Sequence, residues 1–193
     1  IFKESGATGA EIHPDALQDM RLHLRKIDDR LRNTPEASTL FLDCLLESGD
    51  PETVLRAMNE AGVLGRFLPE FGKIVAMMQF NMYHHFTVDE HLLRTVGVLR
   101  ALEAGTLSGD HPLSAQLFPT LTSRRALFVA GLFHDIAKGR NEDHSIAGER
   151  VVREMCPRLG LSAAETETVA WLVRYHLLMS ETAQMRDLND FKT

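Results

Sequence analysis

Apolar residues recur every three or four positions along most of the chain, and this spacing limits the fold more than any other feature of the sequence. Between residues 17 and 31 the spacing would form one apolar face of a single helix. The residues on that face are Leu17, Met20, Leu24, Ile27 and Leu31. No stretch alternates apolar and polar residues over a convincing length, so strands are not expected. The predicted fold class is all-α, with about eight helices.

Capping residues and helix breakers divide this pattern into separate helices. A side-chain cap, alone or with a first-turn proline or a reciprocal glutamate, predicts a helix start. Such caps are Thr34 before Pro35, Asp50 before Pro51, Thr87 with Glu90, Asp143, and Ser162 with Glu165. The central helix is predicted over residues 123–138, with Gly139 as its stop. Residues 65–73 hold two glycines and a proline, which predicts a break between helices.

Composition excludes several classes of protein. With 44% hydrophobic residues among 193, the chain can bury a real core, and its net charge of −6 argues against an extended nucleic-acid surface. The longest apolar run, residues 126–133, is far shorter than the about 20 residues of a membrane span. Cys44 and Cys156 form neither a metal-type pair nor a disulfide framework, which favours a cytoplasmic location.

The run LFHDIAKG places His134 beside Asp135 at the end of the central apolar stretch. Both groups are costly to bury without partners. His134 shares a helical face with core residues and is expected to point inward. Neighbours on a helix lie about 100° apart, so the two side chains are not expected to meet directly but to converge on a third object. A metal ion fits, because imidazole and carboxylate are ordinary metal ligands.

Further ligands would come from other helices, and three histidines are candidates. His91 follows the predicted cap at Thr87, His144 begins the helix after a short polar turn, and His176 has apolar neighbours. Taken alone, such a histidine is more often a hydrogen-bonded core residue than a ligand. The other histidines are expected on the surface, except that His84 and His85 belong either to a surface loop or to the rim of a site. The expected surface histidines are His13, His23 and His111.

Three stretches together, YHHFTVDEHLLRTV, LFHDIAKGRNEDHSIAGERVV and VAWLVRYHLLMSETAQMRD, resemble the HD superfamily of metal-dependent phosphohydrolases. Within it the chain is most similar to the bacterial uridylyl-removing family, whose members act on the nitrogen-signalling protein PII. The resemblance implies a helical leading segment over residues 1–80 and an HD domain over residues 81–193. It also implies nucleotidyltransferase and glutamine-sensing domains elsewhere in the full-length protein.

The resemblance also implies a metal site. His91, His134 and Asp135 match the superfamily's first three ligand positions, and His144 and His176 match histidines that complete a two-metal site or contact phosphate. Manganese or magnesium is the metal that the family suggests, while the donor set also suits iron or zinc. The family's last metal-binding aspartate has no counterpart before Thr193. Asp187 or Asp190 would take its place, or both are solvated or capping residues.

The implied reaction is hydrolysis of the phosphodiester between UMP and a tyrosine of PII, which releases UMP. His134, Asp135 and Lys138 are the expected catalytic residues. Lys138 would hold a phosphate oxygen, or else it opposes the helix dipole. Arg94 and Arg140 are weaker phosphate candidates.

Two other functions stay open from the sequence. One is a stand-alone nucleotide phosphohydrolase or cyclic-nucleotide phosphodiesterase with the same metal site. The other is a non-catalytic helical module that docks PII. No nucleic acid and no membrane is expected as a partner in any of these cases.

Overall fold

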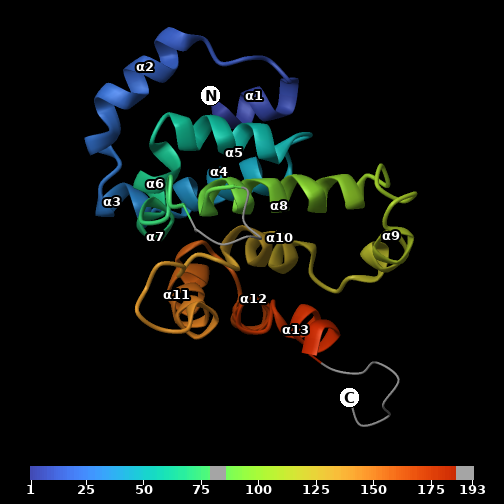
Figure 1. Ribbon diagram of the computed structural model, residues 1–193. Helices are drawn as coiled ribbons and strands as arrows, with labels where there is room; N and C mark the ends of the chain where they lie inside the picture. Colours follow the sequence, from blue (N-terminus) through green and yellow to red (C-terminus); the bar gives the residue numbers. More distant parts are fainter. Residues whose placement is uncertain (79–85, 186–193) are drawn as a thin grey trace.

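A computed structural model describes residues 1–78 and 86–185, and every regular element among them is a helix (Figure 1). The predicted all-α fold class is therefore confirmed. Within the described residues no helix combines the length and the apolar character that crossing a membrane requires.

The leading part of the chain folds into short helices, two of which begin at the predicted caps Thr34 and Asp50. They are α1 (Phe2–Thr8), α2 (Pro14–His23), the 3₁₀ turn η1 (Leu24–Lys26), α3 (Asp29–Arg32), α4 (Pro35–Leu46), α5 (Pro51–Glu60), α6 (Val63–Phe67) and α7 (Pro69–Gly72). The Thr34 hydroxyl accepts from the Ala37 amide at 3.3 Å. Likewise, the Asp50 carboxylate accepts from the Thr53 amide at 3.1 Å. Both caps are confirmed, because each satisfies an amide that the helix itself leaves without a partner.

The second part of the chain contains the longer helices. They are α8 (Val88–Glu103), α9 (Pro112–Leu117), the 3₁₀ turn η2 (Phe118–Thr120), α10 (Arg124–Phe133), α11 (His144–Arg158), α12 (Ala163–Arg174) and α13 (Leu178–Met185). Asp143 caps α11 by accepting from the amides of Ser145 and Ile146, each at 2.9 Å. Ser162 and Glu165 form the predicted capping box at α12.

Helix α10 lies at the centre of the packing. It contacts α8 on one side and α12 on the other; α8 packs in turn against α5, and α12 against α11 (Figure 1). One hydrophobic cluster joins these helices and extends from Phe2 to Val173. Phe128 and Phe133 of α10 are fully buried in it. The apolar run at residues 126–133 is therefore the central core helix.

Three predictions about local structure between residues 17 and 90 are wrong. The single helix over residues 17–31 is broken, because the Asp28 carboxylate accepts from the Leu31 amide at 2.9 Å and starts α3 instead. Leu31 is accordingly 41% exposed. The break at residues 65–73 is two short helices, α6 and α7, whose glycines serve their close approach: a Cβ on Gly65 would lie 3.0 Å from the Gly72 Cα.

The predicted capping box at α8 is the third of these errors. The Thr87 side chain makes no capping hydrogen bond. Glu90 is occupied elsewhere, because its carboxylate pairs with Arg56 of α5 and with Arg94. Tertiary ion pairs have replaced the local motif here.

The capping box of α12 allows a test of stability against pH. The Arg125 guanidinium and the Ser162 amide lower the pKa of Glu165 from 4.5 to about 2. A carboxylate with a depressed pKa stabilises the fold above about pH 4.5, and this contribution is lost as the pH falls toward 2. We expect Glu165→Gln to lower the free energy of unfolding by about 1 kcal/mol at pH 7.

Urea unfolding of parent and variant at pH 7 and pH 3 measures this difference, which should shrink at the lower pH. Glu36→Gln is a suitable control, since no ion pair of Glu36 occurs within the described residues. An equal difference at both pH values would contradict the assigned role of the charge.

Candidate metal centre

Helix α8 supplies the first histidine of the site. Thr87 is extended and α8 begins at Val88, so His91 lies at the end of the first helical turn. Its side chain is 41% exposed, the most accessible of the five candidate ligands. The Nε2 atom of His91 lies 3.0 Å from the Nε2 atom of His134. Two nitrogens that bind one cation at about 2.1 Å and at right angles lie about 3.0 Å apart.

The end of α10 brings His134 and Asp135 together. The helix ends at Phe133, not at residue 138, and tighter turns follow, with Ile136 donating to the Phe133 carbonyl and Lys138 to that of Asp135. This geometry corrects the expectation that neighbouring side chains on a helix stay apart. His134 Nε2 lies 3.4 Å from Asp135 Oδ2.

His144 and His176 approach the same carboxylate from the other side. His144 is the first residue of α11, and His176 lies just after α12, which ends at Arg174. Their Nε2 atoms lie 3.5 Å and 3.4 Å from Asp135 Oδ1. The carboxylate of Asp135 is 3% exposed.

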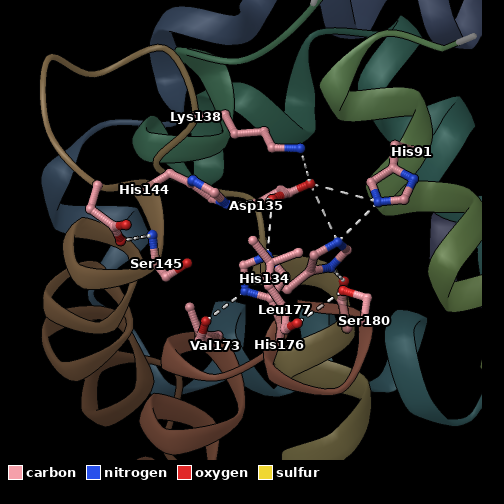
Figure 2. A network of polar contacts seen from close by, with 12 residues as sticks. His91, His134, Asp135, Lys138, His144, Ser145, Val173, His176, Leu177 and Ser180 are labelled. Carbon is pink, nitrogen blue, oxygen red and sulfur yellow. Dashed lines mark hydrogen bonds and ion pairs between the residues drawn. The ribbon is translucent and has the colours of Figure 1, made fainter. Parts of the chain in front are cut away.

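Asp135 therefore belongs to two groups of possible metal ligands, as Figure 2 shows. The first group is His91, His134 and Asp135, and the second is Asp135, His144 and His176. Within each group the ligand atoms all lie within 4.8 Å of one another. Each group could hold a cation, and the two groups share one carboxylate.

Two glycines permit the close helix approaches on which this geometry depends. A Cβ on Gly131 of α10 would lie 2.6 Å from Leu99 of α8. A Cβ on Gly148 of α11 would lie 2.9 Å from Val173 of α12. The first approach brings His91 to His134, and the second brings His144 to His176.

Backbone carbonyls fix the orientation of two of the imidazoles. His134 Nδ1 lies 2.9 Å from the Gly131 carbonyl, and His176 Nδ1 lies 2.8 Å from the Val173 carbonyl. Since a carbonyl only accepts, each Nδ1 donates to it, and each Nε2 is the ring nitrogen that faces Asp135. Protein-bound metals commonly have histidine ligands held in this way. Sequence reasoning missed these carbonyls, although each lies three residues before its histidine at the end of a helix.

Unpartnered buried atoms at the centre of the site fit a cation. Asp135 Oδ1, His144 Nε2 and His176 Nε2 are buried and have no hydrogen-bond partner within the described residues. Buried polar atoms are normally satisfied, and three such atoms around one point indicate a missing common partner. Neutral imidazole nitrogens and a carboxylate oxygen are all electron-pair donors, so a divalent cation satisfies all three.

The electrostatics of the site favour an ionised Asp135. Burial acts to raise the pKa of this carboxyl, but its contacts with His134, His176 and Lys138 hold the pKa well below the usual range. Burial lowers the pKa of His144. Burial would also lower the pKa of His176, but the neighbouring carboxylate outweighs it and the pKa is raised.

Lys138 lies beside the same carboxylate. Its ammonium group is 2.6 Å from Asp135 Oδ2, and its side chain is 11% exposed. The other two cationic candidates are engaged elsewhere. Arg94 pairs with Glu90 and lies over the Phe86 ring, and Arg140 pairs with Glu70 of α7.

The remaining candidates from the sequence lie away from this cluster or outside the description. His13 and His111 are exposed and His23 is half-buried. His84, His85, Asp187 and Asp190 fall outside the described residues.

Comparison with known proteins finds matches along nearly the whole chain. A family model described as "HD domain" matches residues 88–191, and one described as "Uridylyltransferase GlnD third domain" matches residues 4–67. The "Bifunctional uridylyltransferase/uridylyl-removing enzyme" of Novosphingobium aromaticivorans is 56% identical over 193 residues, which are 100% of this chain and 21% of that protein. The chain thus spans about a fifth of the length of this relative.

Proposed function

Since this chain belongs to the HD-domain family, we propose that its metal centre hydrolyses the phosphodiester between UMP and a tyrosine of the PII protein. Family membership and the similarity to a uridylyl-removing enzyme support a hydrolase. The observation that carries the proposal is Asp135, a buried carboxylate that faces two pairs of histidines.

The two groups of ligands would each hold one cation. His91 and His134 act with one oxygen of Asp135, and His144 and His176 with the other. A divalent cation, when bound, lowers the pKa of a coordinated water and draws charge from phosphoryl oxygens. Manganese or magnesium is the cation proposed, and this set of nitrogen and oxygen donors also accepts iron or zinc.

The histidines contribute by staying neutral and fixed. Because the carbonyls of Gly131 and Val173 hold the Nδ1 protons of His134 and His176, the other ring nitrogen of each remains a donor of electrons. His91 lies at the exposed side of the centre, where a protein-bound phosphodiester can enter. The departing tyrosinate has a pKa near 10, so it needs less acid assistance than an alkoxide.

The proposed partners follow from the similar bifunctional enzyme. Uridylylated PII is the substrate and UMP the product, and nucleotidyltransferase and glutamine-sensing domains complete the full-length protein. The proposed setting is the cytoplasm, in which the buried free thiols of Cys44 and Cys156 stay reduced.

The direct test measures UMP release from uridylylated PII by the full-length protein with added Mn²⁺. We expect release by the parent and by an exposed control variant, His111→Ala, and none by His134→Ala. UMP release by His134→Ala at the parent rate would refute the catalytic assignment. Hydrolysis of free nucleotides but not of modified PII would favour a nucleotide phosphohydrolase, and PII binding without bound metal would favour a docking module.

Lys138 offers a prediction that separates substrate binding from metal binding. Lys138→Met removes a positive charge 2.6 Å from Asp135 Oδ2, so metal affinity should stay the same or rise. If the ammonium also holds a phosphate oxygen, turnover should fall by about 10- to 100-fold. Mn²⁺ titration and steady-state UMP release check the two effects. Unchanged turnover would show that Lys138 does not hold a phosphate oxygen.

A further inference from the structure

The part of the chain that precedes the metal centre, residues 1–78, contacts it at two places. We call these residues the leading segment. One place is the first turn of α8, which carries His91. The other is the turn over residues 139–143, which precedes His144. Each contact lies within five residues of a candidate metal ligand.

Helix α5 holds the first turn of α8 through two polar contacts. Arg56 pairs with Glu90, the residue before His91, and is itself held by Glu52 at 2.7 Å. The Asn59 amide donates to the Asp89 carboxylate at 2.9 Å, and Asp89 is 6% exposed. A buried contact and an ion pair together fix this turn more firmly than a surface pair alone.

The turn over residues 139–143 is held by the end of the leading segment. Glu70 of α7 accepts from Arg140. The Met77 side chain lies against Gly139, where an added Cβ would come within 2.7 Å of the methionine Cε. Gly139 also has a φ of +82°, a backbone conformation that strains any residue with a Cβ. The Met77 carbonyl accepts from the Val88 amide at 3.0 Å, which ties the same residue to the start of α8.

His144 depends on this turn more than the other ligands do. The rings of His134 and His176 are held by carbonyls of their own helices. Within the described residues no such carbonyl bond holds the ring of His144. Its placement therefore follows from the backbone of the turn and from the Asp143 cap.

We propose that the leading segment is a positioning frame for the metal centre, in which the Glu70–Arg140 pair sets His144 relative to His91 and so makes the second metal position available. This inference rests on the two-metal centre of the proposed function. Arg140 and Glu70 are positioning residues, because neither lies among the candidate ligands.

The test uses Mn²⁺ and the full-length protein. Two Mn²⁺ ions that share a carboxylate give an exchange-coupled electron paramagnetic resonance signal, which a separate Mn²⁺ site elsewhere in the protein does not produce. We expect Arg140→Gln to need about 10- to 100-fold more Mn²⁺ than the parent to reach the coupled signal. The exchanged pair, Glu70→Arg with Arg140→Glu, should restore the parent titration.

Arg150→Gln is the matched control. Arg150 of α11 pairs with Glu142 of the same turn, so this variant also removes an arginine that contacts the turn but leaves the leading segment untouched. Partly exposed ion pairs contribute little to stability, so all variants are expected to fold, and their thermal unfolding midpoints verify it.

If Arg140→Gln reached the coupled signal at the same Mn²⁺ concentration as the parent, the proposed positioning role of the leading segment would be overturned. The same holds if Arg150→Gln needed as much additional Mn²⁺ as Arg140→Gln, or if the exchanged pair did not restore the parent titration. A parent that binds Mn²⁺ without any coupled signal would overturn the two-metal centre itself. The two failures are therefore distinguishable.

Discussion

Replacing Asp135 by asparagine is expected to remove both metal positions at once. One oxygen of this carboxylate lies near His91 and His134, and the other near His144 and His176. The amide keeps the shape of the side chain but supplies no negative charge to either position. Loss of a group that merely supports a ligand costs about 10- to 100-fold in metal affinity, so loss of the shared ligand should cost at least about 100-fold.

Mn²⁺ titration and UMP release should both show this loss. His176→Ala is the informative comparison, since it removes a ligand from one group alone and should leave an uncoupled Mn²⁺ ion at the other. Asp110→Asn, which changes an exposed carboxylate, should behave as the parent. An Asp135→Asn protein that still bound a coupled Mn²⁺ pair would show that the shared-carboxylate geometry is wrong.

Removal of metal is expected to inactivate the protein and to lower its stability. A ligand that binds only the folded state at a free concentration of 100 times its Kd adds about 2.7 kcal/mol. In the unfolded chain the ligands from four separate helix ends do not lie close together. The metal is therefore expected to bind only the folded state. Dialysis against a chelator should therefore lower the melting temperature, and added Mn²⁺ should restore both stability and UMP release.

The size of this stabilisation should depend on pH. Contacts with Asp135 outweigh burial and raise the pKa of His176. Protonation of His176 at low pH therefore stabilises the folded, metal-free protein. Metal binds only the neutral imidazole, and protons therefore compete with it at low pH. The Mn²⁺-induced rise in melting temperature should be larger at pH 8 than at pH 6. Equal rises at both pH values would argue against histidine ligands.

Prediction from the sequence succeeded where local chemistry decides the structure. The caps at Thr34, Asp50 and Asp143 depend on one side chain and an amide two or three residues away. Such contacts form within one turn and do not require the rest of the fold. Prediction failed for the capping box of Thr87 and Glu90, because Arg56 of another helix forms an ion pair with the Glu90 carboxylate.

For the candidate site, too, the sequence predicted some features and not others. The residue types, their order along the chain and the family resemblance together predicted His91, His134, Asp135, His144 and His176 as ligands. They could not show that α10 ends at Phe133, which lets adjacent side chains meet, nor that Asp135 faces two pairs of histidines.

By itself the sequence determined that this chain is helical, where several of its helices begin, and which side chains have the chemistry to bind a metal. Only the tertiary structure decided that those side chains share one carboxylate and that the leading segment holds the turns that carry them. The physical reason is distance along the chain. Helix caps and apolar periodicity act over a few residues, whereas the centre joins atoms up to 85 positions apart through helix contacts that depend on glycines and ion pairs in other helices.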